Sequence, residues 1–87
     1  LGGAYGRRIV VVAGKGSNGA DGRSAAVRLG RRGARVEVVE AATGPSRLPA
    51  ADLVIDAAYG TGFRGTYAAP DPNGAPVLAV DIPSGVD

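Results

Sequence analysis

Four short apolar runs punctuate the chain, at residues 9–12, 36–39, 53–55 and 77–80. Three of them are continuous rather than alternating. Continuous runs of β-branched residues are typical of strands buried on both faces, as in a parallel sheet. Each run ends in polar or glycine-rich sequence. Because open parallel sheets bind ligands beyond the carboxyl ends of their strands, the pattern predicts a binding site at that edge.

Residues 21–32 have the pattern of an amphipathic helix. Ala25, Ala26 and Leu29 can face a sheet, while the arginines between and after them face water. Gly33 suits the left-handed position that commonly follows a helix end. Strand, glycine turn, helix and strand then make one βαβ unit, which should cross over right-handed.

The later connections contain many turn-forming residues. Residues 41–51 and 64–76 are rich in Pro and Gly and contain no convincing helix. We therefore expect shortened crossovers that leave the sheet faces poorly covered. The predicted fold is an α/β, Rossmann-like three-layer sandwich with a mainly parallel sheet, in a truncated or reduced form. With 87 residues, the chain has room for a single partial domain, 1–87.

Composition narrows the chemistry that the chain can perform. It has no Cys and no His, which excludes disulfides, thiolate catalysis and the commonest metal ligands. The net charge is only +2. The basic residues gather on and after the predicted helix, and without interleaved aromatic residues they indicate a solvated face rather than a nucleic-acid surface. They are Arg23, Arg28, Arg31, Arg32 and Arg35.

The first candidate site is the stretch 14–22, Gly-Lys-Gly-Ser-Asn-Gly-Ala-Asp-Gly. It contains G-x-G-x-x-G directly after a strand and before a helix. Glycines allow a tight turn and close approach of the backbone to a phosphate, and the helix N-terminus offers free N–H groups. Lys15 adds a positive charge. Two alternatives stay open: the glycines serve only helix–sheet packing, and Asp21 is a helix N-cap.

An ordinary NAD enzyme would carry an acidic residue at the end of the second strand to hold the ribose. Glu37 and Glu40 lie near that spacing, which keeps an NAD-dependent oxidoreductase as a rival interpretation. Ser17, Asn18 and Asp21 make a polar set richer than phosphate binding alone requires, and no hydride-transfer site is visible.

The second and third candidate sites follow later strands. Asp56 closes one apolar run and is followed by a second glycine-rich loop, in which Thr61 and Arg64 could bind an anion. The alternative is a surface loop with Asp56 as a turn residue. Asp81 closes the last run, with Ser84 close behind it. Carboxylate, amide and hydroxyl oxygens at converging strand ends are also the ligands that a hard cation prefers.

With these motifs in order, the sequence resembles the NAD(P)H-hydrate epimerase family, the YjeF N-terminal-type domain. Residues 17–22 are similar to the family's N-N-G-G-D-G, and 56–62 match its D-x-x-x-G-T-G. Residues 80–87 match V-D-I-P-S-G-x-D in full. Ser17 and Ala20 depart from the pattern, replacing an Asn and a Gly.

The resemblance implies an isomerase that interconverts the R and S forms of hydrated NADH and NADPH (NADHX and NADPHX) in cofactor repair. It implies one potassium ion, held by Asn18, Asp56 and Ser84. It implies Asp81 as the acid/base residue, with Asp21 as its main competitor. The implied substrate-binding residues are Ser17, Asn18, Gly19, Ala20, Asp21, Gly60, Thr61, Gly62, Phe63, Arg64, Gly65, Thr66 and Asp81.

The implied partners are the dinucleotide substrate, a fused or separate ADP-dependent NAD(P)H-hydrate dehydratase and, as a homodimer, a second copy of the chain. We expect no nucleic acid and no membrane, and a cytoplasmic location. A non-catalytic nucleotide-binding or interaction module of the same fold is an alternative. Joint presence of Asn18, Asp56 and Asp81 favours the enzyme, because a scaffold does not need them.

Overall fold

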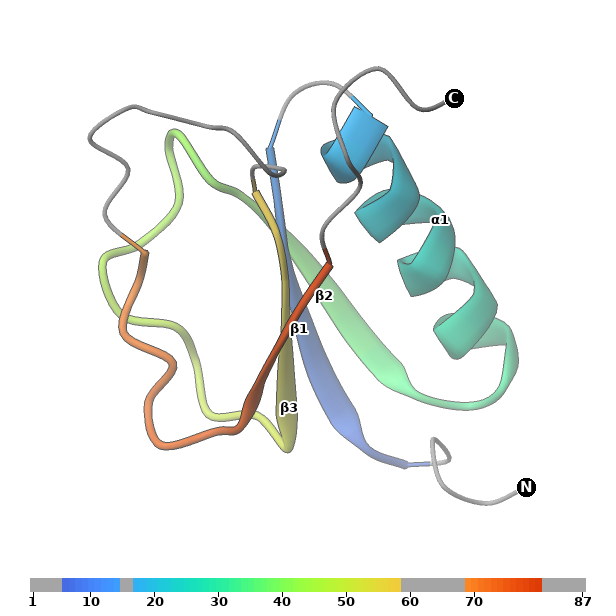
Figure 1. Cartoon of the computed structure of the whole chain (residues 1–87). Coiled ribbons are helices and arrows are strands. Elements are labelled where there is room, and N and C mark those ends of the chain that lie inside the picture. The colour runs from blue at the N-terminus through green and yellow to red at the C-terminus, as the bar shows by residue number, and fades with distance from the viewer. Residues whose placement is uncertain (1–5, 15–16, 59–68, 81–87) are drawn as a thin grey trace.

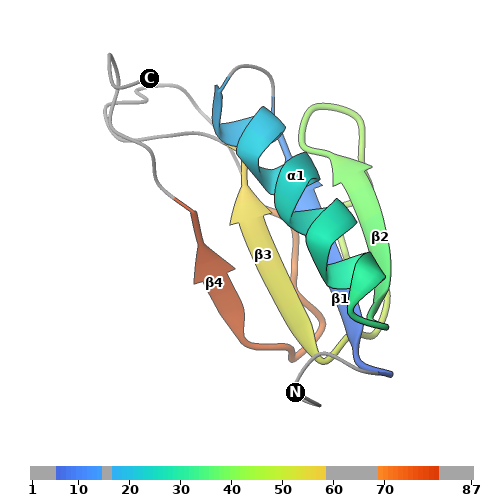
Figure 2. The same ribbon diagram turned by 90° about the vertical axis from the view of Figure 1, so that its right-hand side faces the viewer.

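The computed structural model describes residues 6–14, 17–58 and 69–80, and only the backbone of 17–19. Its sheet has the strand order β2-β1-β3-β4, and all three neighbouring pairs are parallel (Figure 2). The elements in chain order are β1 (Arg8–Ala13), α1 (Ser17–Arg31), β2 (Arg35–Glu40), β3 (Leu53–Ala57) and β4 (Val77–Ala79). All four predicted strands are therefore confirmed.

The sheet is buried at its centre and open at its edges. Every residue of β1 after Arg8 is buried, and Val54 and Ile55 of β3 are buried beside it. This is the burial on both faces that the continuous apolar runs predict. At the edge of the sheet, β4 is exposed along its length, with Val77 and Leu78 more than half accessible. The burial that its continuous apolar run predicts is therefore wrong for this strand, because no further strand or helix among the described residues covers the edge.

One face of the sheet is covered by α1. Ile9, Val11 and Ile55 pack there with Ala26 of the helix. The helix ends in a Schellman motif: the Ala34 N–H donates to the Leu29 carbonyl at 3.1 Å, and Gly33 has a positive φ of 96°. The left-handed role predicted for Gly33 is confirmed. The helix begins at Ser17, four residues before the predicted start.

Loops cover the opposite face, where a larger α/β domain would place helices (Figure 1). Leu48 is only 2% exposed and packs against Val10, Val12 and Val54. The structure thus has three layers: helix, parallel sheet and loops. The predicted Rossmann-like fold with shortened crossovers is confirmed in this reduced form.

Hydrogen bonds join the two covering loops to each other. The Leu48 N–H donates to the Asp71 carbonyl, and the Asp71 N–H donates to the Ser46 carbonyl, both at 2.8 Å. The Asn73 side chain donates to the Leu48 carbonyl at 3.2 Å and accepts from Arg47 at 2.7 Å. These bonds hold Leu48 over the sheet without a helix. Within the described ranges, no helix is long and apolar enough to cross a bilayer.

Candidate functional site

The carboxyl ends of β1, β3 and β4 meet at one edge of the sheet. Val12 pairs with Asp56 across β1 and β3, and Asp56 pairs with Ala79 across β3 and β4. Asn18 is the second residue of α1, so its backbone lies shortly after the end of β1 in the chain. Asn18 and Asp56 therefore belong to the same edge, and the segment after β4 leaves from it too.

Asp56 is half-buried near the end of β3. Its Oδ1 accepts a hydrogen bond from the Ala58 N–H at 3.0 Å, and its backbone carbonyl accepts from the Val80 N–H at 2.9 Å. Among the described residues nothing donates to Oδ2. The bond to Ala58 is that of a turn-forming Asp, so the turn interpretation is supported. The free oxygen leaves room for a second role.

Gly14 joins the end of β1 tightly to the end of β3. Its N–H donates to the Ala57 carbonyl at 3.1 Å. A Cβ on Gly14 would stand 1.8 Å from the Ala58 carbonyl oxygen, so no other residue fits there without a backbone shift. The first glycine of the G-x-G-x-x-G stretch is thus required by the sheet itself.

Gly22 has a similar role in α1. A Cβ there would lie 2.6 Å from the Cβ of Ala57 and 3.3 Å from a methyl of Val11. Glycine therefore lets the first half of the helix approach the sheet. At these two positions packing alone accounts for the glycine, and phosphate binding by 14–22 stays a prediction.

Asp21 is not a helix N-cap, which corrects that alternative. The helix already begins at Ser17, so Asp21 is the fifth residue of α1 and is exposed. Gly19 and Gly22 disfavour a helix locally, and the pattern alone therefore placed the start too late. The Asp21 carboxylate opens onto a pocket of about 510 Å³ that runs along α1.

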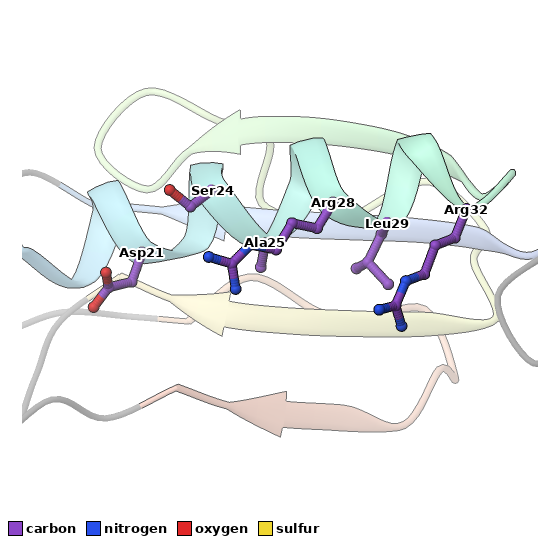
Figure 3. Close-up of a pocket in the computed structure, with 6 residues that line it drawn as sticks. All are labelled: Asp21, Ser24, Ala25, Arg28, Leu29 and Arg32. Atoms are coloured by element: carbon purple, nitrogen blue, oxygen red, sulfur yellow. The ribbon is translucent and has the colours of Figure 1, made fainter.

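This pocket lies along the helix rather than at the strand ends. Figure 3 shows five of its lining residues on α1 and the sixth, Arg32, directly after the helix, with Leu29 and Arg32 extending toward β3. Of the predicted site residues it contains only Asp21. The others that line it are Ser24, Ala25, Arg28, Leu29 and Arg32.

An ion pair between Arg23 and Glu40 was not expected from the sequence. The Arg23 Nη2 donates to both carboxylate oxygens of Glu40, at 2.8 and 2.7 Å, and Nη1 donates to the Gly14 carbonyl at 3.3 Å. Arg23 thus connects α1 to the ends of β1 and β2. The expectation of a solvated face holds for Arg28, Arg31, Arg32 and Arg35, which are exposed, but not for Arg23.

Several predicted site residues lie outside the described part of the chain. They are Lys15, Gly60, Thr61, Gly62, Phe63, Arg64, Gly65, Thr66, Asp81 and Ser84, and for Ser17, Asn18 and Gly19 only the backbone is described. Within residues 6–14, 17–58 and 69–80, no three acidic, His or Cys side chains gather to hold a metal ion.

Comparison with known proteins gives one matching family. A profile described as "YjeF-related protein N-terminus" matches residues 3–51. The bifunctional NAD(P)H-hydrate repair enzyme Nnr of Mycobacterium leprae is 35% identical over 114 positions, covering 99% of this chain and 24% of that protein. The NAD(P)H-hydrate epimerase of Limosilactobacillus fermentum is 34% identical over 112 positions, covering 92% of this chain and 54% of that protein.

A third relative has the same description. The NAD(P)H-hydrate epimerase of Rhodobacter capsulatus is 35% identical over 113 positions, covering 93% of this chain and 53% of that protein. The chain thus spans about a quarter of the bifunctional relative and about half of the single-function ones. No solved structure matches the chain significantly.

Proposed function

The chain belongs to the family of YjeF-related protein N-termini, and on that premise we propose that it interconverts the R and S hydrates of NADH and NADPH. The observation that carries this proposal is the half-buried Asp56 carboxylate at the sheet edge where β1, β3 and β4 end. Each of those strands leads into one of the three motifs that the chain has in common with the family. The names of the relatives support the same activity.

We propose further that residues 1–87 make a single reduced epimerase domain. The match to the M. leprae protein extends over 114 positions, whereas this chain has 87 residues. At least 27 positions of the relative therefore have no counterpart here. The loops that cover one face of the sheet are the natural place for this difference, because Leu48 there does the covering that a crossover helix does in larger domains.

Asn18, Asp56 and Ser84 would hold the potassium ion. The donor set fits, because carboxylate, amide and hydroxyl oxygens are ligands of hard cations. Asp56 fits in particular, since one of its oxygens is fixed by the Ala58 N–H while the other accepts no bond from the described residues. A bound potassium ion would supply a fixed positive charge that orients the polar groups of the hydrated ring.

The substrate would be bound by the two glycine-rich stretches. Backbone N–H groups at the start of α1 suit the pyrophosphate, because a helix N-terminus favours anions. Gly60, Thr61 and Arg64 would contact the same group from the loop after β3. A dehydratase, fused as a second activity or separate, would consume the epimer that this domain supplies.

Asp81 is the acid/base residue of the proposal. Epimerisation needs proton transfer at the hydrated ring, and the chain has neither His nor Cys to perform it. Asp81 directly follows the apolar run that contains β4, and Ala79 of that strand pairs with Asp56. Asp56 is assigned to the metal site, which leaves Asp81 as the candidate that follows a strand end; Asp21 remains its competitor, because α1 does not use Asp21 as an N-cap.

The test compares Asp81→Asn with Asp21→Asn in the conversion of purified R and S hydrates, followed by chromatography. Loss of general acid–base help should slow Asp81→Asn by about 10²–10⁴-fold, with NADP binding retained. Asp21→Asn should stay within a few-fold of the wild type. Near wild-type rates in Asp81→Asn, with a large loss in Asp21→Asn, would transfer the role to Asp21. If the wild-type chain does not interconvert the hydrates, the proposed epimerase activity is refuted.

A further inference from the structure

An apolar groove of about 510 Å³ lies between α1 and β2, the outermost strand. The strand contributes Val36 and Val38 to it, and the helix contributes Val27 and Gly30. Val27 is 55% exposed and Val38 is 40% exposed, which is high for large apolar side chains. The three motifs of the candidate site do not use this groove. The remaining lining residues are Arg23, Ala26 and Ala34.

The backbone of β2 is open on the side away from β1. The Arg35 N–H donates to the Arg7 carbonyl at 2.8 Å, so this position of β2 is turned toward β1. Because backbone groups alternate in direction along a strand, Val36 and Val38 present their N–H and C=O groups to the open side. A strand edge of this kind is a template on which another strand can pair.

The two faces of β2 differ in character. Val36 packs with the core cluster under α1, and Val39 packs with the cluster on the opposite face. Since side chains alternate along a strand, Val38 shares the helix face with Val36, whereas Arg35 and Glu37 share the loop face. Both charged residues are exposed, and the ion pairs found among the described residues include neither. The loop face of this edge thus presents one cation and one anion, two positions apart.

We propose that β2 is the contact between two copies of this chain, which pair their β2 strands antiparallel about a two-fold axis. A contact of this symmetry needs a surface that is complementary to itself. When Val36 lies opposite the Val36 of the other copy, each Arg35 lies opposite a Glu37, and each Val38 lies opposite an Ala34. Arg35 and Glu37 then form non-hydrogen-bonded pairs, in which the facing side chains are closest. The symmetry makes this attractive pair twice.

Charge distinguishes this register from the neighbouring ones. An axis through Arg35 would place two guanidinium groups opposite each other, and an axis through Glu37 would do the same with two carboxylates. An axis through Val38 would place Glu37 opposite Val39 and leave both charges without a partner. Opposite charges across a strand pair are stabilising and like charges are destabilising. The register centred on Val36 is therefore the one that β2 favours.

Pairing in this register also covers the apolar groove. On the helix face, Val36 and Val38 of both copies form one stripe between the two α1 helices, bordered by Val27 (Figure 2). The candidate site lies at the carboxyl ends of the strands, so it stays open in both copies. At the other edge of the sheet, β4 has three residues against six in β2 and is the poorer template. The proposal does not depend on the proposed function.

The first test is sedimentation velocity of the purified chain over a concentration series up to about 1 mM. A contact through one short strand is small, and small interfaces are transient. We therefore expect a dimer that dissociates on dilution. Glu37→Arg and Arg35→Glu each place like charges opposite each other and should weaken the dimer by about tenfold or more. The double variant carrying both changes restores opposite charges and should dimerise like the wild type.

The second test locates the axis with single cysteines, because the chain has no Cys of its own. In the proposed register the two Val36 Cα atoms lie about 5.5 Å apart, within the range of a disulfide. Under oxidising conditions Val36→Cys should form a cross-linked dimer on a non-reducing gel. Val38→Cys is more exposed, but it is offset from its counterpart by about 13 Å along the strands and should stay monomeric.

A third comparison separates the two edges of the sheet. Val38→Lys should abolish the dimer, whereas Leu78→Lys, at a similarly exposed site on β4, should leave it intact. Circular dichroism checks that each variant folds. A wild-type chain that stays monomeric over the whole series would overturn the proposal. Loss of the dimer in Leu78→Lys alone, or cross-linking of Val38→Cys but not Val36→Cys, would overturn it as well. None of these measurements requires enzymatic activity.

Discussion

Replacing Gly14 by Ala should destabilise the fold more than the same change at the other described glycines outside turns. The added Cβ would stand 1.8 Å from the Ala58 carbonyl oxygen, and both atoms are attached directly to the backbone just past the ends of β1 and β3. Neither can rotate away, so the ends of β1 and β3 must separate. The separation also breaks the bond from the Gly14 N–H to the Ala57 carbonyl.

The magnitude follows from these two losses. Overpacking in a closed site costs about 1–3 kcal/mol, and a net hydrogen bond is worth about 1 kcal/mol. Together, Gly14→Ala should lower the free energy of unfolding by about 2–4 kcal/mol. A domain of this size has roughly 4–13 kcal/mol in total. The variant should therefore lose a large part of its stability.

Urea unfolding followed by far-UV circular dichroism measures the difference. Gly30→Ala is the matched control, because nothing lies within 4 Å of a Cβ placed there in α1. It should be as stable as the wild type or more stable by up to about 1 kcal/mol, from helix propensity. A Gly14→Ala midpoint at or above that of the wild type would refute the argument from close approach.

Three further outcomes are expected. Leu48→Ala should lower the free energy of unfolding by about 2–5 kcal/mol, whereas Leu78→Ala, at an exposed site, should change it by less than about 0.5 kcal/mol; equal urea midpoints would show that the loop layer is not core. Replacing NaCl by KCl at constant ionic strength should raise the melting temperature of the wild type, since a ligand of the native state stabilises it; an equal rise in Asp56→Asn would remove Asp56 from the potassium site. Arg64→Ala should weaken NADP binding by about 1.5–3 kcal/mol, the worth of a hydrogen bond to a charge; unchanged calorimetric affinity would contradict its contact with phosphate.

The strands could be predicted because their signal is local. The runs around Val10, Val54 and Leu78 are continuous and end in polar or glycine-rich sequence, and each is a strand of the parallel sheet. The left-handed conformation of Gly33 could also be predicted, because it depends only on the helix before it. The helix start was not, because Gly22 is favoured there by Ala57, a residue from another strand.

The features that the sequence missed depend on contacts between distant segments. Leu48 lies between Pro45 and Pro49, and it is held over the core by a bridge between Arg47 and Asp71 that no local pattern indicates. Arg23 belongs by spacing to the solvated face of α1, yet it meets Glu40, seventeen residues further on. The sheet edge that carries the candidate site could be predicted from the strand topology. The Arg23–Glu40 ion pair at the ends of β1 and β2 could not.

The contact between Gly14 and Ala58 has a mechanical consequence. It fixes the distance between two chain segments where they begin, one that leads into α1 and one that leaves β3. The spacing of the chain at the ends of β1 and β3 is therefore set by backbone against backbone and depends on no side chain. A substitution that separates Gly14 from Ala58 would thus change the distance between two strand ends at once, even though it alters a single residue.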